Sequence, residues 1–400
     1  MLGSPALMSS AGTAYLFDVV RSPRGKARAD GGLAALKPQQ LIHQLCESLD
    51  TRLDDEVTAR AEALLLGCVG QIGAQGGNIA LVSKLHSGLP DTASAYTLNN
   101  YCVSALTAIG QAASMVNSGQ VRNALAGGVE MMSRVPFMAD GADYYTDATM
   151  PARSRYIPVA LAADRLAEDE GIDRAALDAC ALRSQQRATA AEASPALTRS
   201  RIPMKRPDGT TLVVEECVRP QTSAASLAAM QPAFGELANT YAAALGRQLD
   251  HRHTFAHAPP ICDGASLALV GAANSSRRAR ARIVGYAECG GDPYASLLAG
   301  MGAMDRVLKQ AGMQLRDVDC IEFMEAFAVT IAMFLRDRDV DPGRVNVAGG
   351  HLAKGHPMGA SGGILLSTLL DVLEARDGKT GLVVTSGAAG VGAAMLIERC

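Results

Sequence analysis

Two residues able to do covalent chemistry stand far apart in the sequence, each next to a predicted helix start. Cys102 ends the extended run SAYTLNNYC and precedes VSALTAIGQAASMVNSG, whose apolar spacing predicts a helix. A thiol at a helix N-terminus meets the positive end of the helix dipole, which favours the nucleophilic thiolate. The alternative is a buried cysteine that only fills the core. Position alone leaves both interpretations open.

The second residue is His356, in the glycine-rich stretch GGHLAKGHPMGASGG at 349–363. The glycines allow an unusual backbone path before a helix predicted to begin at Ser361. A histidine held in such a loop can take a proton from a thiol. It can also do no more than fill a turn. The stretch lacks the GxxxxGK[ST] order of a phosphate-binding loop.

Two further stretches combine a predicted strand with a turn. IEFMEAFA at 321–328 carries Glu325 where a strand is expected to turn into a helix. In VVTSGAAGVGAAMLIER, Ser386 ends a predicted strand and a run of small residues follows. Neither stretch indicates a function by itself.

The elements around these residues predict a layered α/β fold. Short apolar runs alternate with helical patterns up to residue 130 and again from residue 263. Residues 131–262 are more polar and rich in loops, which indicates an inserted loop domain. We expect an N-terminal half at 1–130 that is completed by about 263–285, the loop domain at 131–262, and a C-terminal half at 286–400. The repeated order of elements suggests an internal duplication.

The amino-acid composition excludes several further classes of function. The 400-residue chain has a net charge of −3, only 4% aromatic residues and no Trp, which disfavours a nucleic-acid surface. Its nine cysteines include no CxxC pair, so no structural zinc site is expected, and free thiols fit a reducing compartment. No secretory signal and no long apolar run stand out. We therefore expect a cytoplasmic enzyme without a membrane span.

The stretches around Cys102, Glu325, His356 and Ser386, in this order, resemble the thiolase superfamily. RSPRGK at 21–26, GGVEMMSRVP at 127–136, GIDRAALDACALRSQQRA at 171–188 and DGA at 263–265 extend the resemblance over nearly the whole chain. It implies two tandem halves packed as a five-layer αβαβα sandwich. It also implies that the inserted loop domain holds coenzyme A, and that the chain associates as a homodimer or homotetramer.

The resemblance also assigns roles. Cys102 matches the cysteine that becomes acylated, and His356 matches the histidine that activates it. The backbone N–H groups of Cys102 and Ala388 match one oxyanion hole, and backbone donors tolerate changes of side chain. The implied substrates are acyl-CoA or acyl-carrier thioesters, with no metal or redox cofactor.

Two positions depart from the family pattern. The second catalytic cysteine, which takes a proton from the acetyl-CoA methyl group, falls on Ser386, and a serine hydroxyl is a far weaker base. The asparagine of the family's NEAF motif, which orients a water in the second oxyanion hole, falls on Met324, beside Glu325. A thioether orients a water poorly. We therefore expect thioester capture by Cys102 to be intact and formation of a carbon nucleophile to be impaired.

Other differences concern the substrate pocket and the histidine loop. The family's histidine–methionine pair falls on Pro158 and Val159, and a pocket serine falls on Pro259. These changes put acetoacetyl-CoA specificity in doubt and leave the acyl length open. His351 is an extra histidine that can supply the missing base or, more commonly for such a residue, face solvent.

The sequence leaves several functions open. The first is an acyltransferase that acylates Cys102 and uses an unusual acceptor, such as a malonyl-type thioester, an amine or a hydroxyl. An ordinary acetyl-CoA acetyltransferase or 3-ketoacyl-CoA thiolase is the alternative within the same class. The two remaining possibilities are a thioester hydrolase and a degenerate acyl-CoA-binding subunit. The intact pair of Cys102 and His356 favours turnover.

Overall fold

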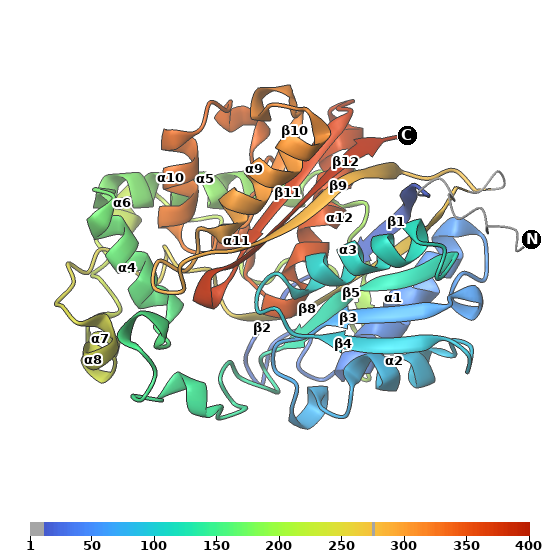
Figure 1. The fold of residues 1–400 in the computed structure, drawn as a ribbon, viewed down its shortest axis with the longest axis horizontal. Coiled ribbons are helices and arrows are strands. Elements are labelled where there is room, and N and C mark those ends of the chain that lie inside the picture. The colour runs from blue at the N-terminus through green and yellow to red at the C-terminus, as the bar shows by residue number, and fades with distance from the viewer. Residues whose placement is uncertain (1–11, 274–276) are drawn as a thin grey trace, which may run out of the picture.

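The computed structural model describes residues 12–273 and 277–400, and most of their strands form one long twisted sheet (Figure 1). The N-terminal part of this sheet follows the order β1 (Ala14–Arg21), β8 (Cys262–Ala272), β5 (Asn123–Met131), β3 (Ala63–Gly67) and β4 (Ser94–Leu98), with the short β2 (Gly25–Lys26) beside β8. The C-terminal part follows the order β9 (Ala281–Gly290), β12 (Val391–Arg399), β11 (Thr380–Ser386) and β10 (Cys320–Phe323).

The two parts of the sheet share a pairing pattern. In the N-terminal part β4, β3 and β5 are parallel, and β8 and β1 then add antiparallel. In the C-terminal part β10 and β11 are parallel, and β12 and β9 add antiparallel. The parts meet where β1 pairs with β9 through Tyr15 and Leu16. This repeated order agrees with the duplication suggested by the sequence.

Helices complete five layers. On one outer side, α1 (Pro38–Leu53) and α2 (Ile79–Ser87) pack on the N-terminal strands. In the middle, α3 (Ser104–Asn117) and α12 (Ser361–Ala375) touch each other and strands of both parts. On the other outer side, α9 (Ala299–Ala311) covers β9, β11 and β12. The expected αβαβα sandwich is confirmed.

The central helix α12 is buried over nearly its whole length because it lies between two faces of the sheet. Residues 358–375 are the one stretch of the described chain that is long and apolar enough to cross a membrane, and 89% of it is buried inside the protein. Its composition therefore suits the core of the sandwich.

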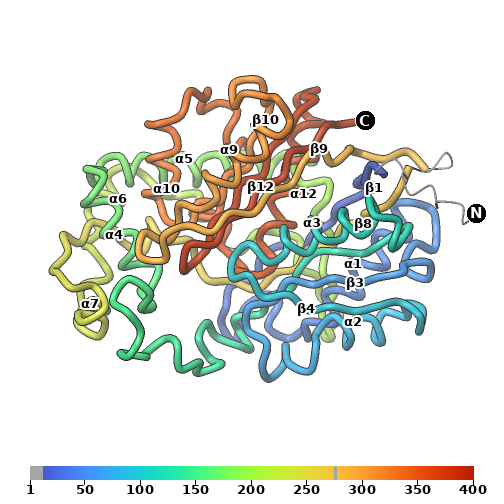
Figure 2. The backbone as a smooth tube through the Cα atoms, in the orientation of Figure 1, coloured from blue at the N-terminus to red at the C-terminus, as the bar shows by residue number. Residues whose placement is uncertain are grey.

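Between β5 and β8 the chain leaves the sheet and forms a separate group of helices, green to yellow in Figures 1 and 2. The two long ones are α4 (Val159–Asp169) and α5 (Arg174–Glu192), which both contact α10 (Ala328–Asp337) of the C-terminal part. The shorter elements are β6 (Met204–Lys205), β7 (Thr211–Leu212), α6 (Ala224–Ala228), α7 (Gly235–Thr240) and α8 (Ala242–Leu245).

The sequence-based boundary near residue 285 falls inside β9. This strand pairs with β12 along nearly its whole length and with β1 at only two residues. Its hydrogen bonds therefore join it to the C-terminal part. A sequence of small and apolar residues does not indicate with which neighbouring strand a β-strand will pair.

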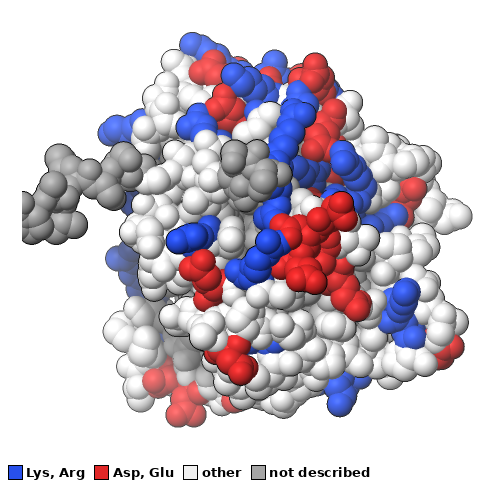
Figure 3. Space-filling view, turned by 90° about the vertical axis from the view of Figure 1, so that its right-hand side faces the viewer, with Lys and Arg blue, Asp and Glu red and all other residues white. Residues whose placement is uncertain are grey.

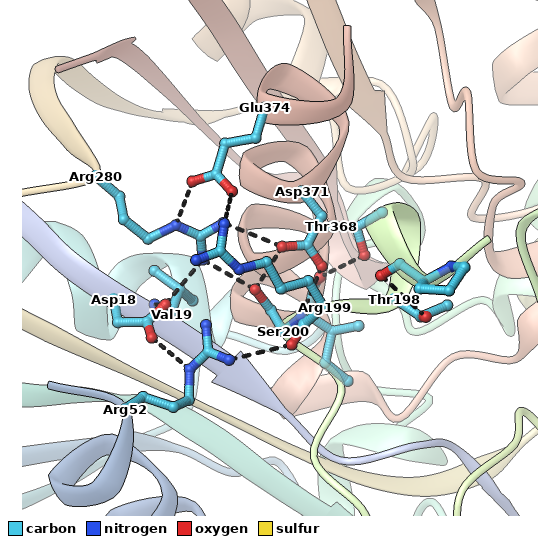
Figure 4. Close-up of polar contacts among 12 residues, drawn as sticks. Asp18, Val19, Arg52, Thr198, Arg199, Ser200, Arg280, Thr368, Asp371 and Glu374 are labelled. Atoms are coloured by element: carbon cyan, nitrogen blue, oxygen red, sulfur yellow. Dashed lines mark hydrogen bonds and ion pairs between the residues drawn. The ribbon is translucent and has the colours of Figure 1, made fainter. Parts of the chain in front are cut away.

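A buried ionic network ties the two parts together beside the β1–β9 junction (Figure 4). The Arg280 guanidinium contacts Asp18 of β1 at 2.8 Å, and Asp371 and Glu374 of α12 at 3.1 and 2.8 Å. Burial opposes ionisation of Asp18, but hydrogen bonds and charge from Arg52 and Arg280 outweigh it and lower the pKa of Asp18. Ion pairs with this many partners are costly to break.

The surface on this side of the molecule carries both signs of charge. Figure 3 shows groups in which basic and acidic side chains lie next to each other, with uncharged surface between the groups. They do not form a broad field of one sign on this face.

Candidate active site

Cys102 lies in a tight turn that leads into α3. Tyr101 adopts a left-handed backbone conformation with φ of 46°. Ser104 holds the turn, because its hydroxyl accepts from the Asn100 N–H at 2.8 Å and donates to the Tyr101 carbonyl at 2.6 Å. A non-glycine residue in this conformation is uncommon and is found where the surrounding structure enforces it, often at active sites. The turn places Cys102 just before the helix begins, as the sequence predicted.

His356 comes from the loop between α11 (His351–Lys354) and α12. Gly355 has φ of 96°, which only glycine adopts easily, and a Cβ there would lie 2.7 Å from the Cys262 sulfur. The backbone N–H of His356 donates to the Pro260 carbonyl at 2.9 Å. Its Nδ1 contacts the Ser361 hydroxyl at 2.8 Å, while its buried Nε2 has no hydrogen-bond partner among the described residues. The Nε2 atom is therefore available to a substrate or a thiol.

Cys102 and His356 line one apolar cavity of about 130 Å³. Val159 and Pro259 line it too, together with the aromatic side chains of Tyr101, Phe137 and Phe327. Pro158 lies beside Val159, at the cap of α4, and is not among the lining residues. Cys102 is therefore no inert core thiol, and two of the three expected pocket residues reach its cavity.

The pKa values of Cys102 and His356 indicate that both side chains are uncharged at neutral pH. Burial raises the pKa of Cys102 to about 12, against the opposing effect of the Ala388 backbone amide. Burial and the nearby Arg24 charge lower the pKa of His356 to about 3. The position of Cys102 before a helix favours a thiolate, but burial has the larger effect on the pKa of this thiol. At neutral pH the site holds a thiol and an uncharged imidazole, so the proton must move as the sulfur attacks.

Ala388 supplies the second backbone donor at Cys102. It lies in the short turn Ala388–Gly390 after β11, lines the same cavity, and directs its N–H to the sulfur. Gly387, just before it, packs against the nucleophile: a Cβ there would come within 3.2 Å of the Cys102 backbone nitrogen. The glycine thus permits β11 to approach the Cys102 turn closely. The amides of Cys102 and Ala388 can then face one oxyanion.

Comparisons with known proteins agree with this geometry. The family "Thiolase, N-terminal domain" matches residues 15–273, and "Thiolase, C-terminal domain" matches residues 277–399. The chain belongs to the thiolase family. Members of this family are acyltransferases, and so is this chain.

Named relatives of this thiolase match over almost their full length. A β-ketoadipyl-CoA thiolase of Pseudomonas knackmussii is 32% identical, covering 96% of this chain and 98% of the relative. A 3-ketoacyl-CoA thiolase of Shewanella frigidimarina is also 32% identical, covering 96% and 99%. The crystal structure of the Bacillus anthracis acetyl-CoA acetyltransferase has a TM-score of 0.86 at 26% identity, covering 98% of this chain and 100% of that one.

Ser386, which the sequence resemblance predicts at the second catalytic position, ends β11 and is 4% exposed. Its hydroxyl oxygen accepts from the Gly300 N–H at 3.0 Å. Ser386 is not among the residues that line the Cys102 cavity, and no basic side chain hydrogen-bonds to it within the described chain. Its proton therefore has no base to take it.

Met324 and Glu325 are both buried, and their contacts are with other parts of the protein interior. Met324 is 1% exposed and packs in the main hydrophobic core. The Glu325 carboxylate accepts from Ser184 at 2.8 Å, Asn346 at 2.9 Å and the Leu352 N–H at 3.0 Å. Neither residue lines the Cys102 cavity, although Ala326 and Phe327 directly after them do. Glu325 thus fixes the histidine loop against α5.

His351 is fully buried, so the expectation that it faces solvent is wrong. Its ring lies edge-on to the His356 ring, with centroids 5.0 Å apart, and neither of its nitrogens has a partner among the described residues. Burial and then the nearby cations, including His356 when protonated, hold its pKa well below the usual range. The sequence of this glycine-rich loop does not indicate that the loop is buried inside the sandwich.

Glu130 also organises the site, and sequence reasoning gave it no role. Its buried carboxylate accepts from the Val69 N–H at 2.9 Å, the Gln75 amide at 2.8 Å and the Gly359 N–H at 3.0 Å. It thereby links the histidine loop to the N-terminal sheet near Cys102. The available signal was an acidic residue placed directly after the apolar run of β5.

Proposed function

We propose that the protein takes an acyl group from an acyl-CoA thioester onto Cys102, and that the acyl group then passes to an acceptor other than an enolate generated by Ser386. The observation that carries this proposal is the convergence of Cys102, His356 and the Ala388 amide on one apolar cavity. Cysteine and histidine in one site are the parts that nucleophilic acyl transfer needs.

The first step balances with these groups alone. His356 Nε2 takes the thiol proton while the sulfur of Cys102 attacks the thioester carbonyl. The backbone N–H groups of Cys102 and Ala388 donate to the resulting oxyanion. The tetrahedral intermediate then collapses, the bond to the sulfur of coenzyme A breaks, and His356 returns the proton to this leaving thiolate. Metal and redox chemistry are not needed for this step, and a chelator should leave it unchanged.

The second step distinguishes the proposal from ordinary thiolase chemistry. Removing a proton from the acetyl-CoA methyl group needs a base on the acceptor side of the site. Ser386 is bonded to the Gly300 N–H and has no activating partner among the described residues. A malonyl-type thioester avoids this need, because loss of carbon dioxide leaves the carbanion directly. An amine or hydroxyl acceptor avoids it as well.

Ordinary thiolysis or condensation is the second candidate. The names of relatives at 32% identity, β-ketoadipyl-CoA thiolase and 3-ketoacyl-CoA thiolase, favour it. It requires a base at the Ser386 position, and His351 is the nearest extra imidazole to His356. Because His351 does not line the cavity, we rank this candidate second.

Intact-protein mass spectrometry after brief exposure to a panel of acyl-CoA thioesters tests the proposal. We expect an acyl adduct on the wild type and none on Cys102→Ala. A panel that leaves no adduct and releases no coenzyme A, while Cys102 still reacts with an alkylating agent, would contradict it. Acyl-carrier thioesters and then a non-catalytic binding subunit would be the next hypotheses. The expected homodimer or homotetramer can be tested by light scattering of the same protein.

A further inference from the structure

A cluster of tyrosines lies next to the catalytic cavity and has no role in the mechanism above. The chain has nine tyrosines, and four of them, Tyr144, Tyr145, Tyr156 and Tyr241, surround a cleft of about 140 Å³. The Tyr156 ring is central: its centroid is 5.0 Å from that of Tyr145, 5.8 Å from Tyr144 and 6.1 Å from Tyr241. We call these four residues the tyrosine cluster.

The tyrosine cluster lies against one residue of the wall of the Cys102 cavity. Phe137 lines the cavity beside Cys102, and its ring lies 6.3 Å from that of Tyr145. Tyr101, another cavity residue, and Cys102 itself are close enough to Tyr156 to add to the rise in its pKa that burial causes. The rings of Phe137 and Tyr145 therefore lie between the Cys102 cavity and the cleft of the tyrosine cluster.

One polar atom of the cluster has no partner. Tyr156 is 4% exposed, and its buried hydroxyl makes no hydrogen bond among the described residues. Its neighbour Tyr145 differs, because its hydroxyl already reaches Asp140 at 3.4 Å. A buried donor without an acceptor destabilises the empty protein, and buried tyrosines normally find one. The missing acceptor is therefore expected from outside the chain.

The cleft also has a cation nearby. The Arg155 guanidinium lines it and donates to the backbone carbonyls of Met150, Ala148 and Ala243 at 3.0, 2.7 and 3.3 Å. No carboxylate forms an ion pair with it in the described part of the chain, although Asp147 also lines the cleft. The cleft therefore accepts neutral oxygens and tolerates a carboxylate.

Resting on the proposed function, we infer that the tyrosine cluster is the distal part of the acyl-binding site, and that Tyr156 selects acyl groups carrying an oxygen acceptor away from the thioester. The class includes acyl-CoA thioesters with a terminal hydroxyl or carboxylate. Plain alkyl groups fit between the aromatic rings but leave the Tyr156 hydroxyl unpaired, so they bind less well. Discrimination based on an unpaired polar group is stronger than discrimination based on size.

The test compares acylation rates of Cys102 for matched thioesters. Butanoyl-, hexanoyl- and octanoyl-CoA are each paired with the counterpart that has a terminal hydroxyl and the one that has a terminal carboxylate. At the length that reaches Tyr156, we expect the wild type to prefer the oxygen-bearing member about tenfold in kcat/KM, the worth of one net hydrogen bond. Comparing hydroxyl with carboxylate shows whether Arg155 adds to the preference.

Two conservative variants assign the effect to one hydroxyl. Tyr156→Phe should lower the preference to within about twofold, because neither member of a pair then meets an unpaired hydroxyl. Tyr145→Phe, whose lost hydroxyl was already bonded to Asp140, should keep the preference. Melting temperatures of both variants check their folding. A wild type without any preference, or a Tyr156→Phe variant that retains it, would overturn the inference alone. Absence of acylation by every thioester would overturn the proposed function with it.

Discussion

The two chemical sides of this thiolase site differ in how they are built. On the capture side, Cys102, His356 and the Ala388 amide come from three distant segments and meet at one cavity. On the second-step side, Ser386 is bonded to a backbone N–H and Met324 is packed in the core. In our proposal the capture side therefore holds the groups that acylation needs, while the second-step side offers no side-chain base in contact with Ser386 within the described chain.

Backbone groups and side chains respond differently to changes of sequence. The oxyanion hole of the capture step consists of backbone amides, which persist as long as the turns around Tyr101 and Gly387 persist. In our proposal the second step depends on side chains, and the hydroxyl of Ser386 does not titrate near neutral pH. Substitutions that restore or remove individual groups can therefore separate the two steps.

The largest expected effect comes from His356. His356→Gln removes the only imidazole of the described chain that lines the cavity, so acylation of Cys102 should fall about 10²- to 10⁴-fold. Rapid-quench measurement of coenzyme A release gives the rate. His86→Gln, a surface change on α2, serves as the control and should leave the rate unchanged. A His356→Gln rate close to that of the wild type would assign the base role elsewhere.

Restoring the second-step side should produce a gain. In the double variant Ser386→Cys, Met324→Asn, thiolysis of acetoacetyl-CoA should rise by about 10² or more, because proton transfer by a positioned group contributes that much. The single variants should gain less, since each restores only one group. Loss of acetoacetyl-CoA absorbance measures the reaction. No gain in a folded double variant would count strongly against an impaired second step.

The pH dependence of Cys102 alkylation should be about tenfold for each pH unit. With the pKa raised to about 12 by burial, the thiolate fraction keeps rising throughout the alkaline range. Alkylation of Cys102 by iodoacetamide should therefore increase from pH 7 to pH 10 without levelling off. Mass spectrometry of the Cys102 peptide follows the reaction. A plateau near pH 8 would mean that the pKa of the thiol lies below its ordinary value and that the helix start outweighs burial.

The smallest effect is expected on the second-step side itself. Ser386→Ala should change Cys102 acylation by less than about twofold, because the hydroxyl does not reach the cavity. The free energy of unfolding should fall by about 1 kcal/mol, since the Gly300 N–H loses its acceptor. Chemical denaturation and coenzyme A release measure the two quantities. A large loss of acylation would place Ser386 in the capture step.

Sequence reasoning predicted the fold and the elements that carry Cys102 and His356 better than it predicted their surroundings. The periodicity of α3 and α12 and the glycines around His356 are local signals, and they led to the right elements. The burial of His351, the role of Glu130 and the high pKa of Cys102 depend on which segments pack together. Such non-local contacts leave no pattern along the chain, so only the folded structure reveals them.

The most direct test follows both steps in one sample. The protein is incubated with acetyl-CoA in deuterium oxide, and mass spectrometry records the acetyl adduct on Cys102 and deuterium in the methyl group of acetyl-CoA. Our account predicts that the adduct forms while the methyl group gains no deuterium above a Cys102→Ala control. Rapid exchange of the methyl protons, at a rate comparable with adduct formation, would show a working second-step base and contradict it.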